Sequence, residues 1–93
     1  MPRRLRGTRR HVAGDRVADY LEAWSRFRDT AVGLGARAWL FRSGDVAGRF
    51  LEFLEWDAAG ADPGSDPRVR SARAALEDFG DGEEELWDEA TWS

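Results

Sequence analysis

The chain has 93 residues, a net charge of −4 and no cysteine, so we expect one domain over residues 1–93 with a thin core. The absence of cysteine excludes disulfides, thiolate nucleophiles and cysteine metal sites. No apolar run follows the basic start, so we expect no signal peptide, no membrane span and a cytoplasmic location.

The two ends of the chain carry opposite charges. Six arginines and one acid lie between residues 3 and 16, whereas eight acids and no base lie between residue 77 and the end. We predict a first strand over Leu5–Val12 that pairs with an acidic last strand, because opposite charges on neighbouring strands stabilise a sheet. Its arginines would face the acids, with Arg4, Arg6, Arg9 and Arg10 on one side and Glu83, Glu84, Glu85, Asp88 and Glu89 on the other. The alternative is an arginine arm for nucleic acid or an anionic membrane, but an acidic end would repel a polyanion, so we expect no nucleic-acid partner.

The segment that follows has the pattern of an amphipathic helix. Its apolar side chains recur at steps of three and four residues, at Val17, Tyr20, Leu21, Trp24, Phe27 and Ala31. Asp15 is the expected N-cap, and Gly33 or Gly35 is the expected end. We expect Tyr20 and Trp24 to pack in the core.

Two strands rich in Trp, Phe and Leu come next, at Ala36–Arg42 and Arg49–Asp57, and the turn residues Ser43, Gly44, Asp45 and Gly48 lie between them. If Phe41 lies opposite Phe50, one face of this hairpin carries Arg37, Trp39, Phe41, Phe50, Glu52, Leu54 and Trp56. The other face then carries Ala36, Ala38, Leu40, Leu51, Phe53 and Glu55. Both faces are largely apolar, so helices are expected to cover one and something else the other.

The rest of the chain completes a β-α-β-β-α-β order. Ala58–Asp66 is a loop, Asp66 and Pro67 begin a second helix that ends at Gly80 or Gly82, and Glu85–Trp92 is the last strand. This order predicts an α+β, ferredoxin-like fold, in which a four-stranded antiparallel sheet has both helices on one face. The first strand is then central and pairs with the last. The free face would be covered by a second copy, so we expect a homodimer.

Two charged residues lie among the aromatic side chains of the predicted hairpin face, Arg37 and Glu52. They either pair with each other or a partner subunit at a dimer interface, or they serve a reaction. In the second reading, Glu52 accepts a proton and Arg37 stabilises a developing enolate. The walls that bind a planar aromatic ligand would be Trp39, Phe41, Phe50, Leu54 and Trp56.

His11 is a further candidate acid or base, although a lone histidine in an arginine-rich strand is more often a solvated edge residue. One histidine and no cysteine exclude a paired-histidine metal motif. Glu83, Glu84 and Glu85 are consecutive and cannot all point one way on a strand, so we expect no metal site there.

A resemblance to a known family rests on three stretches, which read VAGDRVADYLEAWSRFRD, GARAWLFRS and RFLEFLEWD. Together they resemble the dimeric α+β-barrel superfamily, in particular its antibiotic-biosynthesis-monooxygenase-like domains, over about Arg9 to Phe79. The resemblance implies a homodimer with an apolar pocket in each subunit. Some members are cofactor-independent oxygenases of aromatic polyketides, some bind haem, some are isomerases, and many have no known activity.

Two departures from that family pattern are visible. The family's strand commonly has a glutamate two residues before its tryptophan, whereas here Leu54 takes that place and Glu55 directly precedes Trp56. The second helix also has no histidine. The missing histidine argues against haem, and we expect no cofactor. Two hypotheses stay open: a homodimer acting as a cofactor-independent monooxygenase or binding protein for an aromatic small molecule, or a non-enzymatic accessory subunit of a larger complex that uses the sheet face and the charged ends.

Overall fold

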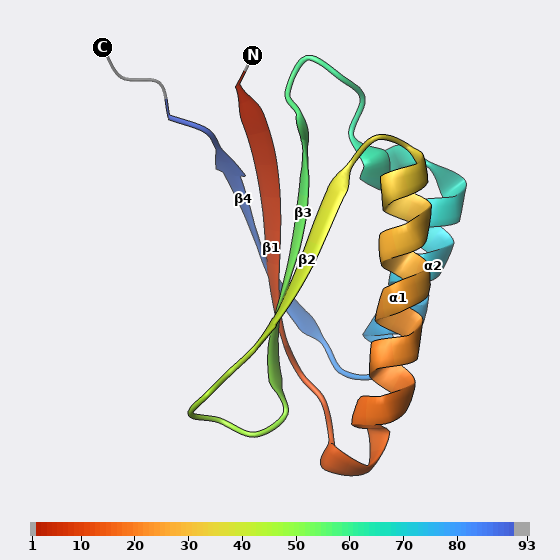
Figure 1. The fold of residues 1–93 in the computed structure, drawn as a ribbon, viewed down its shortest axis with the longest axis vertical. Helices are drawn as coiled ribbons and strands as arrows, with labels where there is room; N and C mark the ends of the chain where they lie inside the picture. The colour runs from red at the N-terminus through yellow and green to blue at the C-terminus, as the bar shows by residue number, and fades with distance from the viewer. Residues whose placement is uncertain (1, 91–93) are drawn as a thin grey trace.

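The structure, a computed structural model, describes residues 2–90. Its strands are β1 (Arg3–His11), β2 (Arg37–Arg42), β3 (Arg49–Asp57) and β4 (Gly82–Asp88), and its α-helices are α1 (Val17–Gly33) and α2 (Pro67–Glu77). Short 3₁₀ helices, η1 (Gly14–Arg16) and η2 (Pro63–Ser65), precede α1 and α2. The predicted β-α-β-β-α-β order is confirmed (Figure 1). No helix within residues 2–90 is long and apolar enough to cross a membrane.

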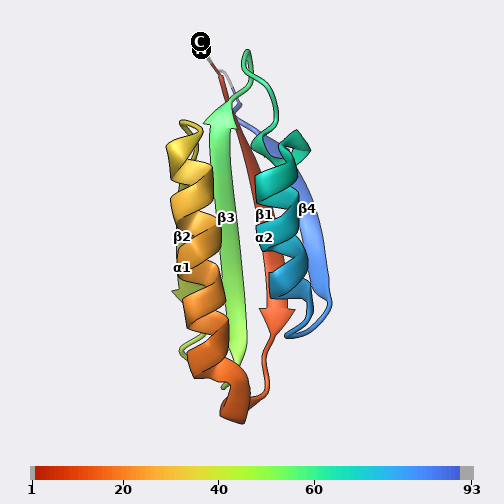
Figure 2. The same cartoon turned by 90° about the vertical axis from the view of Figure 1, so that its right-hand side faces the viewer.

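The four strands form one antiparallel sheet in the order β2-β3-β1-β4. Both α-helices lie on the same face, with α1 nearest β2 and β3 and α2 in front of β1 (Figure 2). The first strand is therefore central and pairs with the last, as predicted. One face of the sheet is covered by helices, and we call the other the open face.

The opposite charges of the two ends meet across β1 and β4. Arg4 contacts Asp88 at 2.7 Å, and Arg9 contacts Glu85 at 3.5 Å. Arg10 is the exception, because its position in the register faces Gly82 and its guanidinium pairs with Glu52 of β3 instead. The prediction of charge pairing between the end strands is thus confirmed, but not for Arg10.

The helix boundaries follow the predicted capping signals only in part. Asp66 caps α2 as predicted, because its carboxylate accepts a 2.8 Å hydrogen bond from the Arg68 N–H. Asp15 lies instead within η1, and α1 begins after Arg16 without a side-chain cap. At the other end, β4 begins at Gly82 rather than Glu85, and the part of the predicted last strand beyond residue 90 lies outside the described residues.

The predicted hairpin register is wrong by one residue. Phe41 lies opposite Leu51, and it is Arg42 that lies opposite Phe50. The Ser43 N–H donates to the Arg49 carbonyl at 2.9 Å and closes the turn one residue further along β3 than predicted. Because side chains alternate along a strand, this shift moves one whole strand to the opposite face relative to its neighbour.

The core lies between the sheet and the helices. Tyr20, Trp24 and Phe27 come from α1, and Val69 and Leu76 come from α2. They pack on Val12, which follows β1, and on the sheet residues Ala38, Phe50, Leu54 and Trp56. The predicted core positions of Tyr20 and Trp24 are confirmed, and both side chains are at least nine-tenths buried.

Candidate functional site

The corrected register divides the predicted site residues between the two faces of the sheet. Phe50, Glu52, Leu54 and Trp56 point to the helices and are all buried. Arg37, Trp39 and Phe41 lie on the open face and are exposed. The predicted single pocket that combined Glu52 with Trp39 and Phe41 is therefore not formed within this chain.

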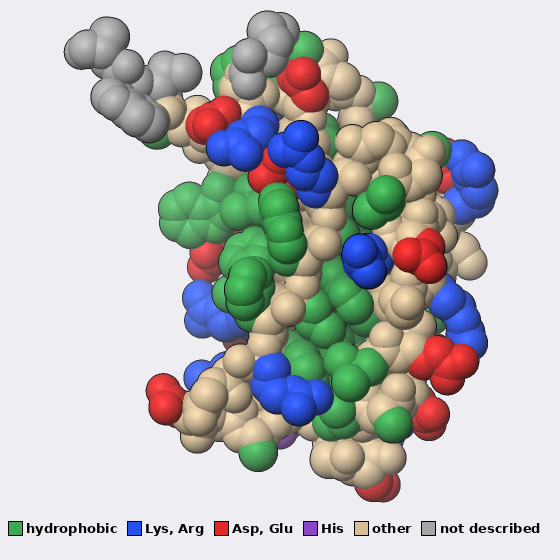
Figure 3. Space-filling model, viewed as in Figure 1, with side chains coloured by type: hydrophobic (Ala, Val, Ile, Leu, Met, Phe, Trp, Pro, Cys, Tyr) green, Lys and Arg blue, Asp and Glu red, His purple; other side chains and the backbone are tan. Residues whose placement is uncertain are grey.

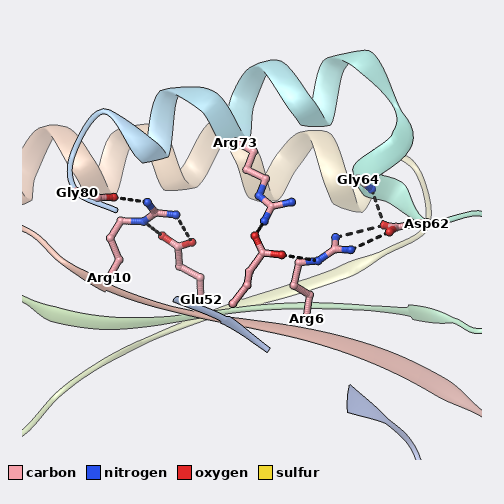
Figure 4. A network of polar contacts seen from close by, with 8 residues as sticks. Arg6, Arg10, Glu52, Asp62, Gly64, Arg73 and Gly80 are labelled. Atoms are coloured by element: carbon pink, nitrogen blue, oxygen red, sulfur yellow. Dashed lines mark hydrogen bonds and ion pairs between the residues drawn. The ribbon is translucent and has the colours of Figure 1, made fainter. Parts of the chain in front are cut away.

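Glu52 is held by two side chains in the interior. Arg10 donates to both carboxylate oxygens, from Nε to Oε2 at 2.8 Å and from Nη2 to Oε1 at 3.1 Å. The Tyr20 hydroxyl donates to the same Oε2 at 2.5 Å. Figure 4 shows Arg10 reaching from β1 to Glu52 on β3 and to the Gly80 carbonyl that follows α2. The side chains of Arg10 and Glu52 are 1% and 8% exposed, which makes this the most deeply buried ion pair among the described residues.

The burial of this triad changes the acidity of its members. Burial raises the pKa of Tyr20 well above its ordinary value, and the charge of Glu52 and its hydrogen bond act in the same direction. For Arg10, burial opposes the charged form most strongly, but the hydrogen bonds and charge of Glu52 together outweigh it and raise the pKa. Arg10 therefore stays a cation and Tyr20 a neutral donor across the physiological range.

A second ionic cluster lies next to the triad, between β1, β4, the start of η2 and the middle of α2. The Arg6 guanidinium donates to both oxygens of Asp62, at 3.3 and 2.8 Å, and contacts Glu84 at 3.2 Å. Arg73 of α2 also contacts Glu84. The hydrogen bond from Arg6 is the main cause that lowers the pKa of Asp62, whereas burial and the charge of Arg6 lower the pKa of Arg73.

Gly64 lets the η2 backbone lie directly on this cluster. Its N–H donates to Asp62 at 2.8 Å, and an added Cβ would lie 2.9 Å from the Arg6 guanidinium. A side chain at this position would displace the arginine. The contacts between Arg6, Asp62 and Gly64 therefore fasten the η2 segment to the sheet (Figure 4).

A cavity of about 20 Å³ lies between the two clusters and the apolar core. Its lining joins polar side chains to aromatic and aliphatic ones and includes Arg6, Thr8, Trp24, Phe27, Glu52 and Leu54. This volume admits about one water molecule. Among the described residues, no group of three His, Asp or Glu side chains is placed to hold a metal ion.

The predicted pairing of Arg37 with Glu52 is wrong, because the register puts them on opposite faces. Arg37 pairs instead with Glu55, its cross-strand neighbour, at 3.1 Å. Arg3 also contacts Glu55, at 3.5 Å. His11 is an exposed residue at the end of β1, opposite Arg49, and it is not near Glu52 in the register.

The open face is a set of cross-strand rows with large apolar side chains. The middle row reads Trp39, Phe53, Gly7 and Glu85 from β2 to β4. Phe41, Leu51, Arg9 and Glu83 form the row on one side, and Arg37, Glu55, Leu5 and Trp87 form the row on the other. Trp39, Phe41 and Trp87 are 40%, 56% and 57% exposed. Figure 3 shows hydrophobic side chains protruding from the sheet on the side away from the helices.

Sequence reasoning missed the roles of Arg10 and Tyr20. The sequence predicts that Arg10 faces the acids of the last strand and that Tyr20 packs in the core. The signal was present in the alternation of β1, since Arg6, Thr8 and Arg10 share one face and that face is the one the helices cover. A buried arginine requires a buried acid, and Glu52 is the acid of β3 on that face.

Solved structures with the same fold include oxygenases. SnoaB, a cofactor-independent oxygenase from Streptomyces nogalater, matches with a TM-score of 0.79 and 17% identity, over 100% of this chain and 97% of that chain. A candidate antibiotic biosynthesis monooxygenase from Caulobacter crescentus matches with a TM-score of 0.81 and 16% identity, over 96% and 91%. A conserved protein from Methanosarcina mazei Go1 matches with a TM-score of 0.83 and 10% identity, over 97% and 95%.

No protein-family model and no curated protein matches the sequence itself. At these identities the likeness establishes the fold. The predicted ferredoxin-like architecture is confirmed, and the chain has the α+β fold of the antibiotic-biosynthesis-monooxygenase-like structures.

Proposed function

We propose that this chain is a homodimeric α+β-barrel protein with a monooxygenase-like role on a planar aromatic molecule, which binds beside Glu52 between the sheet and the helices. The observation that carries the proposal is a buried carboxylate, oriented by Arg10 and Tyr20, at the edge of a cavity with aromatic walls. Apolar walls with a few converging polar groups are typical of small-molecule sites. The oxygenases that share the fold support the same class of activity.

The walls of this pocket differ from those expected from the sequence. Trp24 and Phe27 of α1 replace Trp39 and Phe41, while Leu54 keeps its proposed role. A space of about 20 Å³ is too small for an aromatic ring, so the ligand enters only when a wall moves. The η2 segment is the proposed moving wall, because its Gly64 lines the cavity and the segment is held by the contact between Arg6 and Asp62 and by one buried side chain, that of Pro63.

The chemistry proposed for this pocket begins with a proton transfer. Oε1 of Glu52 accepts one hydrogen bond, from Arg10, whereas Oε2 accepts two, so Oε1 has the free lone pair that takes a proton from an acidic C–H or O–H of the ligand. The resulting carbanion, or the carbanion form of a phenolate, passes an electron to dioxygen, and the two radicals combine through a new C–O bond to a peroxide anion. The peroxide takes the proton back from Glu52. Cleavage of its O–O bond, with loss of the remaining hydrogen of the same carbon, then releases water and leaves a C=O group, so the ligand supplies the electrons that dioxygen takes up. Arg37 and His11, on the open face and at the strand end, have no proposed part in this step.

A second candidate function is that of a non-enzymatic subunit that assembles through the open face. Two observations favour it: both oxygens of Glu52 already accept hydrogen bonds from Arg10 and Tyr20 of the same chain, and the exposed aromatic residues lie on the opposite side of the sheet. In this reading the Arg10, Glu52 and Tyr20 triad serves only to join β1, β3 and α1.

Titration with planar phenols of two or three fused rings, followed by tryptophan fluorescence, separates the two candidates. Trp24 lines the pocket, so binding should quench its emission.

Incubation under labelled dioxygen should then add one labelled oxygen atom to the ligand in the wild type. Glu52→Gln should abolish this incorporation while retaining the native mass in light scattering. The matched control Glu22→Gln changes an exposed residue of α1 and should keep wild-type turnover. A dimer that neither binds nor oxidises any of the phenols would overturn the oxygenase proposal in favour of the second function.

A further inference from the structure

We propose that the aromatic ligand of the pocket is an anion, an aryl carboxylate whose carboxylate group binds to Arg73 and Arg6. This inference rests on the proposed function, because it concerns the same cavity, and it adds the chemical class of the ligand. Three observations carry it: the two arginines line the cavity, their own acidic partners lie outside it, and the wall between them contains the aromatic side chains.

The cavity wall contains two partly buried arginines that come from different elements. Arg6 belongs to β1 and Arg73 to α2, and their side chains are 16% and 25% exposed. Figure 4 shows the Arg73 side chain extending from α2 toward the sheet that carries Arg6. A cation beside an apolar cavity needs an anionic partner, so the partners of these two arginines decide what the wall can bind.

The acids that pair with the two arginines lie outside the cavity. Arg6 contacts Asp62 and Glu84, Arg73 contacts Glu84, and neither acid lines the cavity. The side chains of Asp62 and Glu84 are 40% and 42% exposed. Ion pairs at this exposure are weak, because water solvates both members. An anion that arrives from the cavity can therefore compete with these acids for the guanidinium groups.

The charge of the cavity wall is not balanced by its own residues. Glu52 is the one acid among the described residues that line the cavity, and Arg10 already matches its charge. Within the described part of the chain, Glu84 is the only acid in ion-pair contact with Arg73, and Arg6 shares it. Burial and the charge of Arg6 lower the pKa of Arg73, so its present surroundings favour the cation less than water does. A further anion at the wall would stabilise both guanidinium groups.

The side chains that now hold Arg6 indicate which anion fits. Arg6 donates two hydrogen bonds to the two oxygens of Asp62, at 3.3 and 2.8 Å, which is the paired geometry of a guanidinium and a carboxylate. A carboxylate on the ligand can take the place of Asp62 in the same geometry. Because Asp62 caps η2, this exchange would also release the proposed moving wall as the ligand binds.

The rest of the wall suits the aromatic part of such a ligand. Trp24, Phe27 and Leu54 line the same cavity as the arginines and provide apolar contacts for a ring that carries the carboxylate. Glu52 lines it as well, so it can reach an acidic group elsewhere on that ring. Contacts at two separate points fix the orientation of a planar molecule for the proton transfer.

Calorimetric titration with two matched probes tests the charge of the ligand. One probe is a hydroxynaphthoate with its hydroxyl and carboxylate on different rings, and the other is the corresponding uncharged amide. We expect the wild type to bind the naphthoate at least about tenfold more tightly than the amide. Arg73→Gln should abolish this preference and leave the affinity for the amide within about twofold of the wild type, whereas Arg73→Lys, which keeps the cation, should retain part of the preference.

Arg70→Gln is the matched control, because Arg70 is an exposed residue of the same helix and carries the same charge. This variant should keep the wild-type preference for the naphthoate. An equal loss of preference in Arg70→Gln and Arg73→Gln would overturn the proposal, because the effect would then come from the net charge of the chain. Weaker binding of both probes by the same factor in Arg73→Gln would also overturn it, since Arg73 would then support the pocket without binding the carboxylate.

The two probes separate failure of the carboxylate site from failure of the proposed function. If the wild type binds and oxidises neutral phenols but binds the naphthoate no more tightly than the amide, the proposed function stands and the carboxylate site is wrong. If it binds neither probe, the pocket of the proposed function is wrong and the carboxylate site falls with it.

Discussion

The two sides of the sheet differ in how far their aromatic and charged side chains are exposed to solvent. On the helix side, Arg10 and Glu52 are buried and paired with each other, and Phe50 is 1% exposed. On the open side, Phe41 is 56% exposed and the charged groups pair along the surface. Apolar side chains left in water indicate a surface that another molecule covers, and ion pairs taken out of water indicate a site whose geometry is fixed. In the proposed functions, the helix side therefore serves chemistry or internal cohesion, and the open side serves association.

The difference between the two sides of the sheet is tested most strongly by truncating Phe50 and Phe41 in separate variants. Phe50→Ala removes a ring from a filled core and should cost about 3–5 kcal/mol of unfolding free energy. Phe41→Ala should cost the single chain less than about 1 kcal/mol, because more than half of that residue is already in water. Urea unfolding at matched concentration measures both. Similar losses in the two variants would contradict the division of the sheet into a core side and an association side.

Removing one partner of the buried ion pair should have an effect nearly as large. Glu52→Ala leaves the Arg10 cation buried without an acceptor for most of its donors, which should cost about 3–5 kcal/mol. The control is Glu22→Ala, whose exposed pair with Arg26 contributes about 0.3–0.5 kcal/mol. The double variant Arg10→Met with Glu52→Leu should recover much of the loss, since no unpaired charge remains. A loss for Glu52→Ala no larger than that of the control would mean that water reaches Arg10.

Alkaline titration tests whether the helix side is shielded from water, because Tyr20 is the only tyrosine of the chain. Its pKa in the folded state is raised above the ordinary value of 10.0, first by burial and then by Glu52. The stability that this group contributes is therefore fully present below pH 10 and decreases as the pH rises further. Tyrosinate absorbance should thus appear only together with unfolding, measured by circular dichroism. Absorbance that rises at pH 10 in a folded chain would show that the hydroxyl is accessible.

The smallest expected effect belongs to Asp62, at the edge of the helix side. Its pKa is lowered, chiefly by the hydrogen bond from Arg6, so its contribution to stability is present above the ordinary value of 3.8 and is lost as the pH falls below it. Because its side chain is 40% exposed, Asp62→Asn should cost below about 1 kcal/mol at neutral pH. The variant should also lose less stability than the wild type between pH 5 and pH 3.

The same variant tests the proposed entry of the ligand. If the η2 segment is the moving wall, Asp62→Asn should bind the aromatic probes faster than the wild type, as measured by stopped-flow fluorescence.

Local patterns determined much of what the sequence predicted correctly. The alternation of helix and strand signals specified the β-α-β-β-α-β order, and the opposite charges of the two ends specified that β1 pairs with β4. The cap at Asp66 was also readable, because a side-chain oxygen followed by proline is a signal confined to a few residues.

Only the tertiary structure decided which side chains share a face. Turn residues indicate a turn but do not determine how many residues it contains. A turn that is one residue longer or shorter reverses the faces of one strand relative to the other. This is why Phe41 and Phe50 lie on opposite faces of the sheet. Arg10 and Glu52 lie 42 residues apart in the chain. Their pairing was therefore decided by the fold, which places both side chains on the face that the helices cover. Charge pattern and periodicity act over short distances along a sequence, whereas a site is assembled from strands and helices that meet only in the folded chain.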